Sequence, residues 1–255
     1  MNAALRNSSA HVFVNDLAAP QLDPDDRHHL AKVLRLREGE IVSCSDGAGG
    51  WRLVRWSHGD LVVHPGDDPV VGGVDAVAVG GGAVRHDPPP AYDIAVAFVP
   101  VKGERSEWTV QKLTELGVDR IVPLLPTRRA VVKWSGERLD KQLIRWQRVA
   151  REAAMQSRRT RLPVVESFVT LADVCSRSGA AVADPDGSEL DATTRLIVIG
   201  PEGGFDPVEL RDDVARVALG DTILRAETAT LVAATLLGRI RESQVPRTKE
   251  HHSNG

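Results

Sequence analysis

Hydrophobic and polar positions follow two different patterns on either side of residue 90. Between residues 11 and 64, apolar positions alternate with polar ones in short stretches separated by glycine-marked turns. These stretches lie at 11–14, 41–45, 51–56 and 60–64. The pattern predicts short strands, and several such strands with tight turns within about 65 residues are typical of a small β-barrel. A module of this kind is expected to bind a partner rather than to catalyse a reaction.

Two segments of this first region are not predicted to be strands. Residues 1–10 show no sustained pattern and are expected to form a frayed leader. Residues 25–35 are expected to form a short helix, because Leu30, Val33 and Leu34 repeat at helical spacing. These three side chains are predicted to share one face of that helix.

Beyond residue 91 the apolar positions form continuous runs instead of alternating ones. The clearest continuous run lies at 94–99, and further strands are predicted at 120–125, 164–168, 180–183 and 195–199. Continuous apolar runs predict strands that are buried on both faces, as in a parallel sheet. Amphipathic segments lie between the runs and predict helices that cover the sheet. The second region is therefore expected to be a mostly parallel α/β domain.

Four helices are predicted around this sheet. One ends at Gly117, and a second covers 137–157 with a continuous apolar stripe. A third begins at Asp206-Pro207, a typical N-cap followed by a first-turn proline, and its predicted buried face is Leu210, Val214 and Val217. The last, 230–237, is apolar on nearly all sides, so the sheet must cover it, alone or together with a second subunit.

These patterns divide the chain into four segments. A β-barrel domain is expected over 1–72, followed at 73–90 by a glycine- and proline-rich stretch that is a linker or the last barrel strand. The α/β domain is expected over 91–245, and the polar tail 246–255 is expected to be disordered.

Composition restricts the class of protein. The chain has 255 residues and is 42% hydrophobic, which suffices for a sizeable core. No apolar run approaches about 18 residues, and the N-terminus lacks the apolar core of a secretory signal. Cys44 and Cys175 are the only cysteines and lie far apart, and no third donor is spaced with His28 and His29. We therefore expect a cytoplasmic protein with reduced thiols, no membrane segment and no metal site.

Charge is distributed unevenly. The net charge of the chain is −3, but residues 128–161 carry eleven Lys and Arg against three acidic residues. A basic segment of net charge about +8 in an otherwise acidic chain predicts a surface that binds phosphate groups. The alternative is a solvated helix face with no ligand.

Two glycine-marked loops lie near the C-terminal end. The motif Gly200-Pro201-Glu202-Gly203-Gly204-Phe205 follows the apolar run 195–199, and the segment 219–229 leads into the last helix. Ligands of open α/β sheets bind beyond the carboxyl ends of the strands, where glycines let the backbone approach a ligand closely. Neither loop has the spacing of a dinucleotide fingerprint. We expect the two loops to form one small-molecule site, the alternative being two ordinary turns.

Several motifs in a fixed order resemble those of a known family. They are Lys102-Gly103-Glu104-Arg105, the segments 28–37, 111–118 and 219–229, and the loop 200–205. Over residues 11–243 the chain resembles the 16S ribosomal RNA uridine-N3 methyltransferases of the SPOUT superfamily. The resemblance implies a PUA-like β-barrel followed by a SPOUT α/β domain with a trefoil knot. It also implies a homodimer that uses S-adenosylmethionine to methylate N3 of a specific uridine in 16S ribosomal RNA of the small subunit.

The resemblance also implies roles for individual residues. The cofactor is expected to contact Ala183, Asp184, Gly200, Pro201, Glu202, Gly203, Leu219, Gly220, Ile223, Leu224, Arg225 and Thr228. Arg225 is expected to stabilise negative charge on a uracil oxygen, and Glu202 or Glu227 to accept the N3 proton. The alternative is that Glu227 pairs with Arg225 and that Glu202 only holds its loop. RNA is expected to contact Arg35, Arg37, Lys102, Arg105, Arg128, Arg129, Arg158 and Arg159.

Two other functions compete with this interpretation. The first is a non-enzymatic RNA-binding protein, in which the barrel and the basic helix bind RNA and the glycine loops are turns. The second is a SPOUT methyltransferase that acts on another RNA, either tRNA or a ribose 2′-hydroxyl. Titration with S-adenosylmethionine separates the first alternative from the enzyme.

Overall fold

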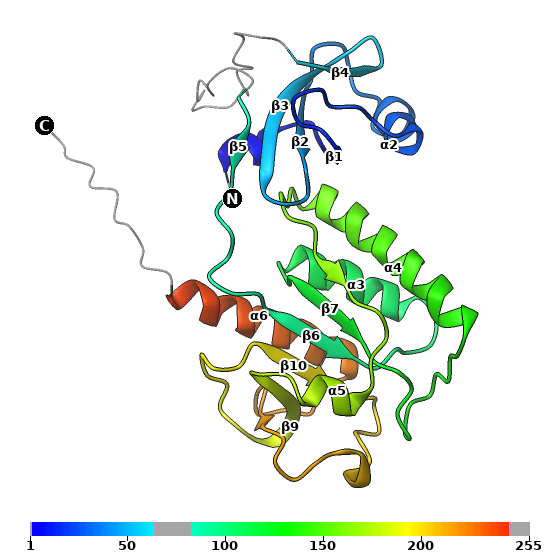
Figure 1. Cartoon of the computed structure of the whole chain (residues 1–255), viewed down its shortest axis with the longest axis vertical. Coiled ribbons are helices and arrows are strands. Elements are labelled where there is room, and N and C mark those ends of the chain that lie inside the picture. Colours follow the sequence, from blue (N-terminus) through cyan, green and yellow to red (C-terminus); the bar gives the residue numbers. More distant parts are fainter. Residues whose placement is uncertain (1, 64–82, 245–255) are drawn as a thin grey trace, which may run out of the picture. The chain divides into compact units, whose positions relative to one another are not determined.

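The computed structural model describes residues 2–63 and 83–244 (Figure 1). The predicted tail 246–255 and most of the predicted linker or last strand 73–90 lie outside the described residues. The chain forms two compact units. The first contains the residues up to Pro89 together with Ala150–Leu162, and the second contains Pro90–Val149 and the residues from Pro163 onward.

The first unit is built on a five-stranded sheet. Its strands are β1 (Ala10–Phe13), β2 (Ile41–Ser45), β3 (Gly50–Ser57), β4 (Asp60–Val62) and β5 (Arg85–His86). They lie in the order β1-β2-β3-β4, with β5 also paired to β3, and all pairs are antiparallel except β1 with β2. Val12, Val42 and Val54 are almost completely buried in the core beside this sheet. The alternating apolar pattern therefore located the first four strands correctly.

The N-terminal residues form a helix, so the prediction of a frayed leader was wrong. Helix α1 covers Ala3–Asn7, and the side chain of Asn2 caps it by accepting a hydrogen bond from the backbone N–H of Ala4. Leu5 is 1% exposed and packs with Trp51 and Leu53. The five-residue helix is too short for its periodicity to show in the sequence, and burial against β3 stabilises it.

The predicted helix over 25–35 is divided into two parts. Helix α2 covers Pro24–His28 and begins with Asp23 as N-cap, and a π-helical turn, η1, follows over His29–Val33. Only Leu30 of the predicted apolar face is buried, whereas Val33 and Leu34 are 60% and 46% exposed. The wider π turn rotates the positions after Leu30 away from the face that α-helical spacing predicts.

Residues 150–162 belong to the first unit, although the sequence-based division placed them in the second domain. Helix α4 covers Glu137–Gln156, and near its end Ala154 and Met155 lie in the core beside β1 and β2. The backbone N–H of Gly49 donates to the carbonyl of Thr160 at 3.0 Å. A segment distant in sequence therefore completes the first unit, which a linear division cannot represent.

The second unit is built on a six-stranded sheet in which every pair is parallel. Its strands are β6 (Ala95–Phe98), β7 (Arg120–Pro123), β8 (Val164–Val165), β9 (Ala180–Ser188), β10 (Leu196–Ile199) and β11 (Arg216–Val217). Their order across the sheet is β11-β9-β10-β6-β7-β8. The parallel sheet confirms the prediction from the continuous apolar runs.

Helices cover this sheet. They are α3 (Arg105–Glu115), the first part of α4, α5 (Leu171–Cys175) and α6 (Ala226–Gln244). Helix α6, drawn in orange-red in Figure 1, packs against β6, β10 and α3. Gly117 follows α3 with a φ of +83°, as expected for a residue that ends a helix. No helix among the described residues is long and apolar enough to cross a membrane.

The third predicted helix is only a single turn. Asp206 does cap it, and Glu209 completes the capping box. The element is a 3₁₀ turn, η2, that covers only Pro207–Glu209. Val217 lies in β11 and is 4% exposed, so it is buried by a strand rather than by a helix. Strand β11 has only two residues, and so brief an element leaves no hydrophobic period in the sequence.

Candidate functional site

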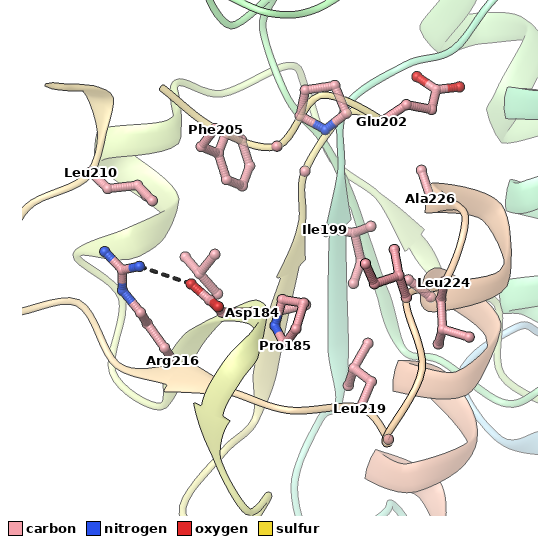
Figure 2. Close-up of a pocket in the computed structure, with 18 of the residues that line it drawn as sticks. Asp184, Pro185, Ile199, Glu202, Phe205, Leu210, Arg216, Leu219, Leu224 and Ala226 are labelled. Carbon is pink, nitrogen blue, oxygen red and sulfur yellow. Dashed lines mark hydrogen bonds and ion pairs between the residues drawn. The ribbon is translucent and has the colours of Figure 1, made fainter. Parts of the chain in front are cut away.

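The two glycine loops meet at a cavity beyond the carboxyl end of β10 and beside residues 182–185 of β9 (Figure 2). The cavity has a volume of about 340 Å³, which is within the range of small-molecule sites. The loop after β10 supplies Gly200, Pro201 and Glu202, and the segment before α6 supplies Leu219 and Leu224. This position agrees with the rule that ligands of parallel sheets bind at the carboxyl ends of the strands.

The first loop is a tight turn that exposes its backbone to the cavity. The backbone N–H of Gly204 donates to the carbonyl of Pro201 at 2.8 Å, and Gly204 has a φ of +68°. A Cβ at Gly200 would come within 3.2 Å of the Phe205 ring, so a side chain there would disturb the ring that lines the cavity. Glycines therefore allow this loop to be both sharply turned and closely packed.

The second loop has unpaired backbone groups beside the cavity. Residues 219–225 form no regular element, and within the described part of the chain no backbone hydrogen bond is found for the amides of 219–224. Ile223 in this loop is 90% exposed. Backbone donors at a concave surface that the described residues leave unpaired are suited to hydrogen bonding with a ligand.

One side of the cavity is charged and the other is apolar. Asp184 on β9 accepts a hydrogen bond from the guanidinium of Arg216 on β11 at 2.8 Å, and the two side chains face each other in Figure 2. Asp184 also accepts from the backbone N–H of Asp186 at 3.0 Å, and these two hydrogen bonds lower its pKa. Leu219, Leu224 and Ala226 lie on the other side. The site therefore suits a ligand with one apolar and one charged end.

Glu227 at the start of α6 has one paired and one unpaired carboxylate oxygen. Its Oε1 lies 3.6 Å from Nη1 of Arg105, at the start of α3. Its Oε2 is buried and has no hydrogen-bond partner among the described residues. The alternative considered from the sequence was a pair of Glu227 with Arg225; in the structure the partner is Arg105, because packing of α3 beside α6 brings the two helix starts together.

Nine of the twelve residues assigned to the cofactor from the sequence line the cavity, the exceptions being Gly203, Arg225 and Thr228. Glu202 lines it and is exposed, whereas Arg225 is exposed and lies outside the lining. Arg216 also lines the cavity and was missed by the sequence analysis. Its strand is too short to be recognised, and no pattern links it to Asp184, so no signal in the sequence could have identified it.

The cations assigned to RNA differ in how they are held. Arg35, Arg37, Lys102 and Arg128 are exposed, and the backbone at Arg35 has a φ of +53°. Arg158 is half-buried, and its guanidinium donates to the carbonyls of Ser8 at 2.9 Å and Met155 at 3.2 Å. Burial lowers the pKa of Arg158. Arg158 is therefore tied into the first unit, whereas the side chains of Arg35, Arg37, Lys102 and Arg128 are exposed to solvent.

Comparison with known proteins relates both units to RNA-modifying enzymes. A family described as the RNA methyltransferase domain matches residues 88–238, and one described as the RNA methyltransferase PUA domain matches residues 22–57. The ribosomal RNA small subunit methyltransferase E of Mycobacterium bovis is 35% identical over 240 residues, which cover 87% of this chain and 86% of that protein. That of Bacillus subtilis is 29% identical, covering 84% and 87%.

Solved structures share the fold. A putative methyltransferase from Legionella pneumophila, in complex with its cofactor SAM, superposes with a TM-score of 0.73 at 24% identity and covers 90% of this chain and 96% of its own. The ribosomal RNA small subunit methyltransferase E of Neisseria gonorrhoeae, bound to S-adenosylmethionine, gives 0.69 at 23% identity, covering 91% and 97%. The predicted combination of a PUA-like domain and an α/β methyltransferase domain is thereby confirmed.

Proposed function

This chain belongs to the family of ribosomal RNA small subunit methyltransferases E, and we propose that it methylates N3 of a uridine in 16S ribosomal RNA of the small subunit, with S-adenosylmethionine as cofactor. The observation that carries the proposal is the cavity formed by the two glycine loops beyond the carboxyl end of β10 and beside residues 182–185 of β9. Its residues suit this cofactor in size, in exposed backbone donors and in the division between an apolar and a charged side.

The cavity residues fit the two ends of the cofactor separately. Leu219, Ile223 and Leu224 provide an apolar surface for the adenine, next to backbone groups that can pair with its ring nitrogens. The pair of Asp184 and Arg216 offers an anion and a cation for the ammonium and carboxylate of the amino-acid end. When bound, the cofactor supplies an electrophilic methyl group on its sulfonium.

Removal of the N3 proton requires an acceptor, and Glu227 suits this role. Its Oε2 is a buried acceptor that has no hydrogen-bond partner among the described residues, and such an atom costs about 1–3 kcal/mol unless a donor reaches it. The N3–H group of uracil is a donor of the required kind. Arg105 holds the other oxygen and keeps the carboxylate oriented. Glu202, which lines the cavity but is exposed, is the alternative acceptor.

Cations of both units are proposed to stabilise the negative charge of the uracil and to bind the RNA phosphates. Arg225 is proposed to approach a uracil oxygen, where negative charge develops as the proton leaves. Arg35, Arg37, Lys102 and Arg128 are proposed to contact phosphates, because they are exposed. Roles for Arg105, Arg158 and Arg159 in RNA binding stay predictions. Affinity for RNA should therefore fall as salt concentration rises.

The same family membership is the basis for a proposal about topology and assembly. We propose a trefoil knot in the second unit, a homodimer, and action in the cytoplasm on the small ribosomal subunit or its 16S RNA. Two features support the homodimer: Ile223 is 90% exposed beside the cavity, and Val232 and Leu236 of the largely apolar helix α6 are only partly buried. A second subunit would cover such apolar surface.

Methylation of defined RNA substrates tests the proposal. Small subunits and free 16S RNA that lack the modification are incubated with the protein and S-adenosylmethionine, and the nucleosides are then analysed by mass spectrometry. 3-Methyluridine is expected, and a reaction without the protein is the control. A methylated ribose, or methylation of tRNA alone, would support the other SPOUT target. RNA binding without cofactor binding would support the non-enzymatic alternative.

A further inference from the structure

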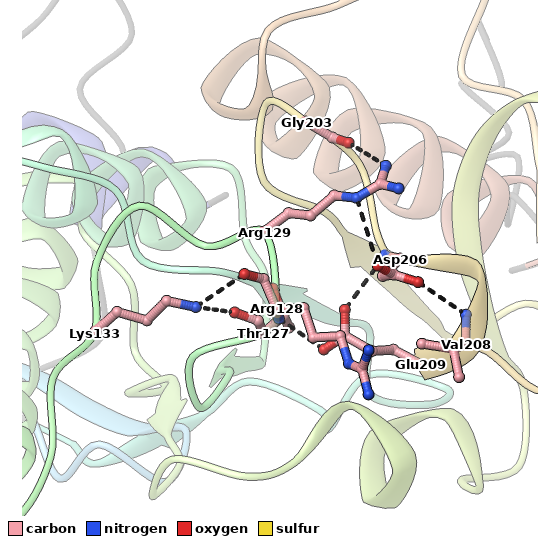
Figure 3. A network of polar contacts seen from close by, with 8 residues as sticks. All are labelled: Thr127, Arg128, Arg129, Lys133, Gly203, Asp206, Val208 and Glu209. Carbon is pink, nitrogen blue, oxygen red and sulfur yellow. Dashed lines mark hydrogen bonds and ion pairs between the residues drawn. The ribbon is translucent and has the colours of Figure 1, made fainter.

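The segment after β7 is attached to the first glycine loop by its own side chains and backbone (Figure 3). The guanidinium of Arg129 donates to the carbonyl of Gly203 at 3.0 Å, and its Nε lies 4.0 Å from the carboxylate of Asp206. The backbone of Gly203 also lies against the aliphatic stem of Arg129, because a Cβ there would be 3.8 Å from Cβ and Cδ of the arginine. Arg129 therefore contacts the loop at Gly203 and the N-cap of η2 at Asp206.

A second connection runs through Glu209. One of its carboxylate oxygens accepts from the backbone N–H of Arg128 at 2.8 Å, and the other accepts from the backbone N–H of Asp206 at 3.3 Å. The ammonium of Lys133 donates to the carbonyls of Thr127 and Arg128, which keeps the segment 127–133 folded back on itself. Glu209 thus joins the capped turn η2 to the backbone that carries Arg129.

Apolar packing supports these polar contacts. Ala130 is 5% exposed, and Phe205 and Leu210 pack against the same core cluster. The segment 127–133 is therefore held both by the core cluster beside the sheet and by η2. Because the backbone that carries Arg129 is already held in place, the arginine loses less conformational entropy when its guanidinium forms hydrogen bonds.

We propose that Arg129 is a positioning residue for the cofactor: it holds Gly203 and η2 so that the backbone of 200–204 is already arranged when S-adenosylmethionine binds. This inference rests on the proposed function and gives Arg129 a role other than the phosphate contact expected from the sequence. The neighbouring Arg128 uses only its backbone in the network, and its exposed side chain is available to RNA. Two adjacent arginines thus serve different ligands.

Calorimetric titration with S-adenosylmethionine, together with steady-state kinetics, tests the division. Arg129→Ala is expected to raise the Kd and the KM for S-adenosylmethionine about tenfold, the effect of losing one charge-assisted hydrogen bond. Its kcat at saturating cofactor should stay within about threefold of wild type, because positioning of the free loop affects cofactor binding first. Arg129→Lys keeps a donor and should recover part of the lost affinity. The matched control Arg128→Ala should leave the Kd for S-adenosylmethionine unchanged and weaken RNA binding.

A second, milder variant keeps the proposal testable if Arg129→Ala does not fold. Asp206→Asn removes the charge partner of Arg129 but keeps an oxygen that can cap η2, so it should raise the Kd for S-adenosylmethionine by a smaller factor than Arg129→Ala. The inference would be overturned if Arg129→Ala left the Kd for S-adenosylmethionine unchanged but weakened RNA binding. The dependence of RNA affinity on salt concentration would then also fall by about the contribution of one phosphate contact, as expected if Arg129 binds RNA. Failure of the wild-type chain to bind the cofactor would instead refute the proposed function.

Discussion

Arg105 and Glu227 are joined across the starts of two helices, with Nη1 of the arginine 3.6 Å from Oε1 of the glutamate. The side chain of Glu227 is 18% exposed and that of Arg105 is 57% exposed, so the pair lies at the edge of the protein interior. The pairing leaves Oε2 of Glu227 buried and without a partner among the described residues. One oxygen of this carboxylate is therefore held by an arginine, and the other is an acceptor that no described residue satisfies.

Substitution of Glu227 by glutamine tests whether it accepts the N3 proton. Glu227→Gln keeps the shape but removes the basic oxygen, and kcat is expected to fall by about 100-fold or more, as for loss of a general base. The Kd for S-adenosylmethionine, measured by calorimetry, should not change. Glu202→Gln is the matched variant in the cavity lining. If Glu202→Gln loses turnover while Glu227→Gln retains it, the roles are reversed.

The ion pair of Asp184 and Arg216 is expected to favour ligands that carry the amino-acid end of the cofactor. Arg216→Ala should weaken binding of S-adenosylmethionine about tenfold, because the carboxylate of the amino-acid end loses its cation. Binding of 5′-methylthioadenosine, which lacks that end, should be almost unaffected. Arg211→Ala is the control, since Arg211 is exposed, pairs with Asp213 and does not line the cavity. Equal losses for both ligands would contradict this assignment.

Buried His11 predicts a pH dependence of stability. Its Nδ1 lies 2.8 Å from Oγ of Ser43 and its Nε2 lies 2.9 Å from the carbonyl of Arg159, which fits a neutral ring that donates from Nε2. Burial lowers the pKa of His11 from its ordinary 6.5 to about 4. Below pH 6.5 the unfolded chain binds a proton that the folded chain does not, so stability should decrease as pH falls from 6.5 towards 4.

Urea unfolding at pH 7, 6, 5 and 4 measures this effect. The full loss should reach about 3 kcal/mol when the pH approaches 4, at about 1.4 kcal/mol per pH unit. A His11→Gln variant cannot titrate, so its free energy of unfolding should change much less over the same range. The same slope in both proteins would mean that another group causes the pH dependence.

The contact of Asp26 with Arg151 predicts the stability of the first unit. The carboxylate of Asp26 is bound by two guanidinium nitrogens, at 3.0 and 2.5 Å, and its side chain is 8% exposed. Asp26→Ala leaves a half-buried cation without this partner and should lower the free energy of unfolding by about 3 kcal/mol. Asp25→Ala, at an exposed position of the same helix, should cost less than about 1 kcal/mol. Similar losses in both variants would show that the ion pair is unimportant.

Much of the fold was predictable from local pattern. Four strands of the first unit and the central strands of the parallel sheet lie where alternating or continuous apolar runs predicted them, because burial of one or two faces imposes a period that the sequence must carry. Helix α4 also lies where its apolar stripe indicated, with Trp146 completely buried. The elements missed or misjudged were α1, α5, η2 and β11, whose few residues are held by tertiary packing.

The candidate site divides in the same way. The sequence by itself determined that one glycine loop follows a buried strand and that a second precedes the last helix, and chain direction in a parallel sheet places the first loop at the edge where ligands bind. The resemblance to a known family added nine of the twenty residues that line the cavity. Only the tertiary structure decided that Arg105 pairs with Glu227, that Arg216 faces Asp184, and that Arg129 holds Gly203. Each of these contacts joins residues 32 to 122 positions apart, and a pairing between side chains at such separations leaves no period or motif in a single sequence.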